Sequence, residues 1–169
     1  MSKSKIKEKN EKRLFKIITL GDSGVGKTCI LRRFVTGKFD KNTLSMIGFE
    51  TSSKEIVLKN GTKVTLQLID TAGQENYHAL ATTYIRNSDG VLFVFSHDSQ
   101  ESFNNINNLK NEHNFYGYAD TSAKDGIGIE DVFSEMGELL NRIKGKNDQK
   151  QNIKILNMKK KKKKTCFLW

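Results

Sequence analysis

Residues 21–28 have the sequence Gly-Asp-Ser-Gly-Val-Gly-Lys-Thr, and they set the expected fold of this 169-residue chain. The spacing is that of a P-loop, G-x-x-x-x-G-K-T, and the apolar run Leu14–Leu20 directly precedes it. A buried strand that ends in a glycine-rich turn and opens a helix presents successive backbone N–H groups to a phosphate. In this pattern Lys27 reaches the β- and γ-phosphates of a nucleotide, and Thr28 binds Mg²⁺. The stretch therefore predicts a nucleotide-phosphate site rather than a glycine loop without chemistry.

The residues after this loop alternate between helical and strand patterns. Apolar spacing over Cys29–Val35 predicts a helix that ends near Thr36. Two β-rich runs follow, Phe49–Leu58 and Val64–Ile69, and the Asn60-Gly61 dipeptide between them is a strong hairpin signal.

Three later segments continue the alternation of helix and strand. Residues 77–86 have a helical pattern, and residues 90–95 form a continuous apolar run, typical of a strand that is buried on both faces. Residues 129–140 carry apolar side chains at the spacing of an amphipathic helix. The whole pattern predicts an α/β fold, a P-loop NTPase three-layer sandwich with a mostly parallel sheet.

Charge is divided unevenly along the chain, whose formal net charge is +10. Residues 1–16 carry seven basic and two acidic side chains, residues 141–169 eleven and one, and the residues between them eleven and sixteen. The body is therefore acidic, at −5, and the two basic ends contain little that could form a core. We expect a flexible basic arm over residues 1–13, one globular domain over 14–145 and a polybasic tail over 146–169.

A second motif, Asp-Thr-Ala-Gly-Gln-Glu, occupies residues 70–75. Asp70 at a strand end can hold Mg²⁺ through water, and the backbone N–H of Gly73 could contact a γ-phosphate. Gln74 can orient an attacking water. Alone, these residues would be interpreted as an acidic turn, but about forty residues after a P-loop they indicate a nucleotide-hydrolysing site.

Taken together, these motifs resemble those of small GTPases of the Ras superfamily, closest to the Rab branch. The resemblance covers about Leu14 to Ile143 and implies a molecular switch that binds Mg²⁺ with GTP or GDP and hydrolyses GTP. It also implies effectors, exchange factors and GTPase-activating proteins as partners, in vesicle trafficking or membrane signalling. The residues that carry it are the P-loop, Asp70–Glu75, Tyr84-Ile85-Arg86, Ser102-Phe103 and Thr121-Ser122-Ala123-Lys124.

The resemblance also implies roles for individual residues. Thr28 and Asp70 would serve the metal, Gly73 would contact the γ-phosphate, and Gln74 would position the catalytic water. A turn at Ser122-Ala123-Lys124 would contact the guanine base, although the same three residues in isolation would suggest a plain turn. The implied phosphate contacts are Ser23, Gly24, Val25, Gly26, Lys27, Thr28 and Cys29.

The first departure from the family pattern is a missing hydroxyl. Family members carry Thr before an Ile-Gly pair, and its hydroxyl closes on Mg²⁺ in the GTP state, whereas this chain has Met46 there. A thioether is too soft a ligand for Mg²⁺. Ser45 could serve only if the loop shifted by one residue, and we expect loss of the ligand instead.

The second departure is a gap. The family has an apolar strand and an Asn-Lys-x-Asp motif before the Thr-Ser-Ala-Lys turn, whereas this chain has only Asn104–Asp120 there, with Asn105–Asn114 simply polar. We expect one strand and its adjoining helix to be missing, which would expose sheet edges or force irregular repacking. The same gap removes the carboxylate that binds guanine in the family. Asp120 and Asp125 are the nearest replacements. Alternative splicing, a faulty gene model or a degenerate paralogue would each produce such a gap.

The tail carries a lipidation pattern. Lys159–Lys164 precedes Cys166, which is followed by two apolar residues and Trp169, as in a C-a-a-X prenylation signal with an atypical last residue. The lysine run alone would suggest a solvated tail or a nuclear-localisation-like patch. With Cys166 it predicts attachment to an anionic membrane surface. Only Cys29 and Cys166 are cysteines, and no signal-peptide or transmembrane stretch is evident, so we expect the cytosol and the cytosolic face of a membrane.

Three functional hypotheses follow from the sequence. The first is a working GTPase switch, and the second is a nucleotide-impaired pseudo-GTPase that acts as a binding module, as Met46 and the gap suggest. The third and weakest is a basic-tail nucleic-acid binder, and we expect no nucleic-acid partner.

Overall fold

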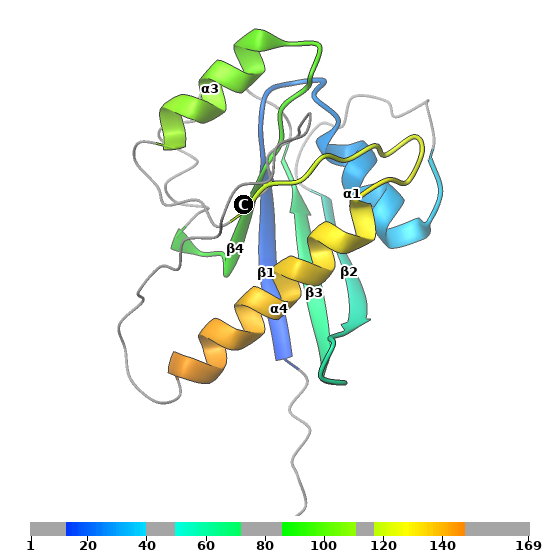
Figure 1. Ribbon diagram of the computed structural model, residues 1–169, viewed down its shortest axis with the longest axis vertical. Helices are drawn as coiled ribbons and strands as arrows, with labels where there is room; N and C mark the ends of the chain where they lie inside the picture. The colour runs from blue at the N-terminus through cyan, green and yellow to red at the C-terminus, as the bar shows by residue number, and fades with distance from the viewer. Residues whose placement is uncertain (1–12, 40–49, 72–85, 111–116, 148–169) are drawn as a thin grey trace, which may run out of the picture.

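The computed structural model of the chain describes residues 13–39, 50–71, 86–110 and 117–147 (Figure 1). In chain order its elements are β1 (Arg13–Leu20), α1 (Lys27–Thr36), β2 (Glu50–Val57), β3 (Lys63–Asp70), β4 (Gly90–Phe93), α3 (Gln100–Lys110) and α4 (Ile129–Asn147). Each segment expected to form a strand does so, with ends that differ by one or two residues. The helix expected over residues 77–86 falls, except for its last residue, outside the described residues.

The four described strands form one sheet in the order β2-β3-β1-β4. β1 is parallel to both β3 and β4, and β2 is antiparallel to β3. Ile17 of β1 lies opposite Leu68 on one side and Gly90 on the other, so β1 is central. Since parallel strands end at the same edge of a sheet, the loop after β1 and Asp70 at the end of β3 are brought together. The expected mostly parallel α/β sheet is confirmed.

Apolar clusters lie on both faces of this sheet, as expected for three layers. Figure 1 shows α1 and α4 in front of the strands and α3 near their upper end. Phe15 and Ile17 of β1 belong to the core beneath α1 and α4. Ile18 and Leu20 of β1 belong to the opposite core, where they pack with Ile106 of α3. Successive strand residues point to opposite faces, so a central strand buried on both sides is apolar along most of its length. This is the reason that the run before the P-loop is so uniformly hydrophobic.

The hairpin between β2 and β3 follows its sequence signal. Gly61 has φ 80, a left-handed conformation that glycine adopts without strain. The backbone N–H of Thr62 donates to Asn60 Oδ1 at 3.0 Å, which is the local bond that favours asparagine in turns. The Asn-Gly pair therefore supplies both the conformation and the hydrogen bond of the turn.

The polar stretch after Ser102 is a correction to the sequence interpretation, which treated Asn105 onward as simply polar. α3 continues through this stretch to Lys110. Its start is capped, because the Ser102 backbone N–H donates to Ser99 Oγ at 3.1 Å. Phe103 and Ile106 then pack against the sheet at helical spacing. Among the described side chains of α3, these two supply its apolar contacts with the sheet, which is why the pattern was weak.

The sheet edge at β4 is the place where a further strand was expected to be missing. Among the described residues no strand pairs with the outer side of β4, and residues 117–121 follow an irregular path. The only pairing described there is an isolated bridge between Ser122 and Ile127. The four-stranded sheet is thus consistent with the expected shortening.

Candidate functional site

The loop between β1 and α1 has the backbone that a phosphate cradle requires. Gly21, Gly24 and Gly26 have φ values of 149, 76 and 101, and Gly26 directly precedes the helix. A Cβ atom built on Gly21 would lie 2.1 Å from the carbonyl oxygen of Val94, so only glycine allows this approach to the end of β4. The first turn of α1 therefore begins where the loop ends, and the N-terminus of a helix favours an anion such as phosphate.

Lys27 is folded into this loop. Its side chain is only 5% exposed, and its Nζ donates to the carbonyl oxygens of Gly21 at 2.8 Å and Asp22 at 2.6 Å. Burial lowers the pKa of Lys27 below its ordinary value of 10.5, while the carboxylates of Asp70 and Asp22 oppose that shift. The structure thus holds a cation among backbone groups at the position where a nucleotide phosphate would sit.

Thr28 and Asp70, the two residues expected to serve the metal, are in direct contact. Thr28 Oγ1 donates to Asp70 Oδ2 at 2.5 Å, across 42 residues of sequence. Asp70 is 6% exposed and ends β3, while Thr28 lies in the first turn of α1. A hydroxyl and a carboxylate oxygen are the donors that Mg²⁺ prefers, so this pair fits the ion.

Two further hydrogen bonds position the site. Thr71, just after Asp70, donates from Oγ1 to the carbonyl oxygen of Thr19 at 2.6 Å, which fixes the exit of β3 against β1. Asn105 Nδ2 of α3 donates to Asp22 Oδ2 in the phosphate loop at 3.0 Å. The sequence interpretation missed Asn105 because it lies in the stretch treated as simply polar. The helical spacing of Phe103 and Ile106 is the signal that could have placed it.

The other expected phosphate contacts lie along the loop and the first turn of the helix. Ser23 and Gly24 are exposed, whereas Val25, Gly26 and Cys29 are partly buried. Gly73, Gln74, Ser45, Met46 and Cys166 fall outside the described residues, so their expected roles remain predictions.

The turn expected to contact a base is closed by its own hydrogen bonds. The Ser122 N–H donates to Ile127 O at 3.0 Å, and the Gly126 N–H donates to Ser122 O at 2.7 Å. Ser122 Oγ also donates to Asp125 Oδ2 at 2.7 Å. Ala123 packs on the core beneath α1 and α4, and Lys124 is exposed.

Asp120 and Asp125, the possible replacements for the missing aspartate, have different surroundings. Asp125 is engaged by Ser122 within the turn. Asp120 lies 3.3 Å from His97 Nε2, in the segment after β4. The turn also meets α1, because a Cβ on Gly126 would come within 2.5 Å of the Arg33 guanidinium. These contacts join this part of the chain to α1 and to the segment after β4. A base-reading role for either carboxylate stays a prediction.

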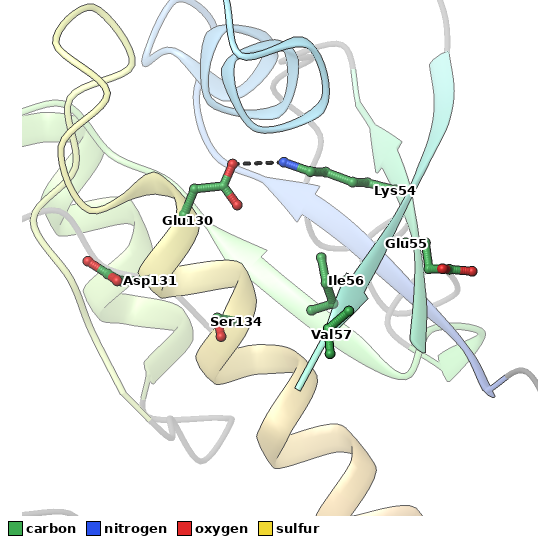
Figure 2. Close-up of a pocket in the computed structure, with 7 residues that line it drawn as sticks. All are labelled: Lys54, Glu55, Ile56, Val57, Glu130, Asp131 and Ser134. Carbon is green, nitrogen blue, oxygen red and sulfur yellow. Dashed lines mark hydrogen bonds and ion pairs between the residues drawn. The ribbon is translucent and has the colours of Figure 1, made fainter. Parts of the chain in front are cut away.

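A groove between β2 and α4 lies apart from this site (Figure 2). Lys54 reaches across it and donates to Glu130 Oε1 at 2.7 Å and to the carbonyl oxygen of Phe34 at 2.6 Å. Among the described residues, none of those expected to bind nucleotide lines the groove. Its lining residues are Lys54, Glu55, Ile56, Val57, Glu130, Asp131 and Ser134.

The fold and the loop geometry define the class of protein as a P-loop α/β nucleotide-binding domain. The model of the Ras family matches residues 16–117, and the chain therefore belongs to that family of small GTPases.

Its relatives are Rab proteins, so the chain is a Rab-like member of the family. Human Ras-related protein Rab-9A is 46% identical over 114 residues, which are 68% of this chain and 55% of that protein. Mouse Ras-related protein Rab-9B is 43% identical over 112 residues, 66% of this chain and 54% of that protein. Ras-related protein Rab-10 of Caenorhabditis elegans is 47% identical over 93 residues, 55% of this chain and 46% of that protein. The chain thus spans about half the length of the relatives it matches.

Proposed function

We propose that this chain binds a magnesium–guanine nucleotide at residues 23–29 and hydrolyses GTP as a membrane-associated switch in vesicle trafficking or membrane signalling. The contact between Thr28 and Asp70, beside the buried ammonium of Lys27, supports the proposal most directly. It brings together two sequence motifs that are far apart in the chain, and in the proposal these motifs hold the cation and the phosphates.

Each residue of the site has a physical task in this proposal. The backbone N–H groups of the loop donate to the phosphates, and Lys27 places a positive charge beside them. Thr28 and Asp70 would hold Mg²⁺, which neutralises phosphate charge when it is bound. Gln74 would orient the attacking water, and Gly73 would contact the γ-phosphate. Ser122, Ala123 and Lys124 would contact the base. These contacts would not include the carboxylate that binds guanine in the family.

The nucleotide content of the purified full chain tests this proposal. We expect GDP to be released when the protein is denatured and the supernatant is chromatographed. Lys27→Ala should bind Mg–GDP at least tenfold more weakly, because a hydrogen bond to a charged group contributes about 1.5–3 kcal/mol. Equal Mg–GDP affinity of the two proteins would exclude Lys27 from the phosphate site.

A nucleotide-impaired pseudo-GTPase is the second candidate, and Met46 and the missing Asn-Lys-x-Asp segment favour it. This candidate predicts that the purified protein contains no nucleotide. The nucleotide content therefore separates the two candidates in one measurement.

Membrane attachment is the remaining part of the proposal, and it rests on the sequence pattern of Lys159–Lys164 and Cys166. One lipid chain binds a bilayer only marginally, and nearby lysines add about 1 kcal/mol each at an anionic surface. None of the described helices is long and apolar enough to cross a membrane.

A further inference from the structure

Asp22 is a residue of the phosphate loop to which the proposed function gives no task. Its carboxylate Oδ2 accepts a hydrogen bond at 3.0 Å from Nδ2 of Asn105, which lies 83 residues later in α3. Its backbone carbonyl accepts the ammonium of Lys27 at 2.6 Å. One residue thus joins α3 on one side to the cation of the site on the other.

The residues around Asn105 anchor it firmly to the sheet. Ile106, the next residue, is 5% exposed and belongs to the core between α3 and the sheet. Ser102, one turn earlier, is 1% exposed, and its Oγ donates to Ser99 O at 2.8 Å and accepts from the Ser96 N–H at 3.1 Å. Asn105 itself is exposed at the surface of this fixed helix. Its amide therefore meets the loop from a helix that is packed on the sheet.

The neighbour of Asp22 on the other side is fixed as well. Gly21 approaches the carbonyl oxygen of Val94 so closely that a Cβ would lie 2.1 Å from it. Between this contact and the start of α1, the Asp22 carboxylate is the point at which another helix holds the loop. The loop carbonyls that receive Lys27 are those of Gly21 and Asp22, the two residues held in this way.

We propose that Asn105 is a positioning residue for nucleotide binding, which acts through Asp22 to hold the loop carbonyls that orient Lys27. This inference rests on the proposed nucleotide-binding function and adds α3 to the site. It also gives α3 a direct connection to the phosphate loop.

A double-mutant cycle on the full chain tests the proposal, with Mg–GDP affinity measured by calorimetry. Asn105→Ala should weaken binding about two- to tenfold, less than a buried bond to a charged group would give, because the pair is exposed. Asp22→Ala should weaken binding at least as much, and the double variant should be no weaker than Asp22→Ala alone. Asn107→Ala, at an exposed position of the same helix, is the matched control and should leave the affinity unchanged.

A swapped pair distinguishes positioning from a general loosening of the fold. Asp22→Asn combined with Asn105→Asp again places an amide opposite a carboxylate, and it should recover most of the affinity lost in Asn105→Ala. Additive effects in the cycle, no recovery in the swap, or an unchanged affinity in Asn105→Ala would each overturn the inference alone. A wild-type chain that binds no Mg–GDP would overturn the proposed function, and the inference with it.

Discussion

At the scale of single residues, the site depends on a lysine that is held among backbone carbonyls before any phosphate arrives. The Lys27 ammonium loses water on burial and is compensated by two carbonyls and by the carboxylates of Asp22 and Asp70. Such an arrangement keeps the Lys27 side chain in one conformation, so less conformational entropy is lost when a ligand binds. The sequence motif identifies this lysine, but only the fold shows which carbonyls hold it.

The lowered pKa of Lys27 predicts a pH dependence of nucleotide affinity. Phosphates add negative charge beside the ammonium, so the pKa of Lys27 should be higher in the complex than in the free protein. At pH values between the Lys27 pKa of the free protein and that of the complex, nucleotide binding is then accompanied by proton uptake. The nucleotide affinity should therefore fall as the pH rises through the Lys27 pKa of the free protein, which lies below 10.5. Calorimetry in buffers of different ionisation enthalpy measures this uptake. Lys27→Ala should show none in the same range.

Gln74 gives a prediction about chemistry rather than binding. Its amide is expected to orient water and to contribute little to the ground state, so Gln74→Leu should slow single-turnover GTP hydrolysis with little change in GTP affinity. The wild-type rate should itself be low, because Met46 leaves the metal shell one hydroxyl short. Unchanged hydrolysis in Gln74→Leu would remove this residue from the mechanism.

At the scale of elements, one side chain joins a strand and two helices. Lys54 of β2 donates to Phe34 O near the end of α1 and to Glu130 of α4, and its Nζ lies 4.1 Å from the Phe34 ring centroid. A cation at a helix C-terminus is favourable. Below it, Phe34 stacks on Phe133 of α4 with ring centroids 3.9 Å apart. This cluster keeps α1, and with it the phosphate loop, in its place on the sheet.

Replacing Lys54 should therefore destabilise the fold more than a surface lysine would. Lys54→Ala should lower the free energy of unfolding by about 1–3 kcal/mol, since it removes two hydrogen bonds and a cation–π contact. Lys63→Ala is the control, because the Lys63 side chain is 66% exposed and pairs with Glu55 at 3.3 Å. It should cost within about 0.5 kcal/mol. Equal losses for the two variants in urea unfolding would show that Lys54 does not join these elements.

Elements also show what the sequence could predict and what it could not. The strands, the hairpin and the helix that starts at the P-loop were predictable because apolar period, glycine position and motif agree there. α3 was underestimated, since Phe103 and Ile106 are the apolar side chains that mark its buried face among those the structure describes. The Thr28–Asp70 pair was expected from motifs, whereas Asn105–Asp22 depends on how two distant segments dock. No local pattern contains that information.

At the scale of the whole molecule, charge separates an acidic body from basic ends. This division suits a domain whose tail is drawn to an anionic membrane while its body stays in solution. Membrane residence should then depend on Cys166 and on the lysines together. Cys166→Ser should move the protein to the soluble fraction of cells, and replacing Lys159–Lys164 by Gln should make residence weaker and more sensitive to salt. A Cys166→Ser variant that stays fully membrane-bound would contradict lipid anchoring.

We expect the gap before Thr121 to leave the phosphate half of the molecule intact and to shorten the base half. In the family, the missing aspartate accepts two hydrogen bonds from guanine, each worth about 1.5–3 kcal/mol. Their loss should lower the affinity for GDP by a factor of roughly 10² to 10⁴, and it should mainly reduce the preference for guanine over adenine. Asp125 accepts a hydrogen bond from Ser122 Oγ, so we do not expect it to restore the full preference. Asp120 Oδ1 lies 3.3 Å from His97 Nε2 and has no hydrogen-bond partner among the described residues, so Asp120 is the stronger candidate for a replacement.

Calorimetric titration of Mg–GDP and Mg–ADP into the wild-type chain and Lys27→Ala tests the phosphate-site assignment most directly. We predict that both nucleotides bind the wild type, with only a modest preference for GDP, and that both lose at least tenfold in affinity in Lys27→Ala. Binding that is the same in wild type and Lys27→Ala, or absent from the wild type, would contradict the account. Tight GDP binding with strong rejection of ADP would contradict the claim that the base half is impaired.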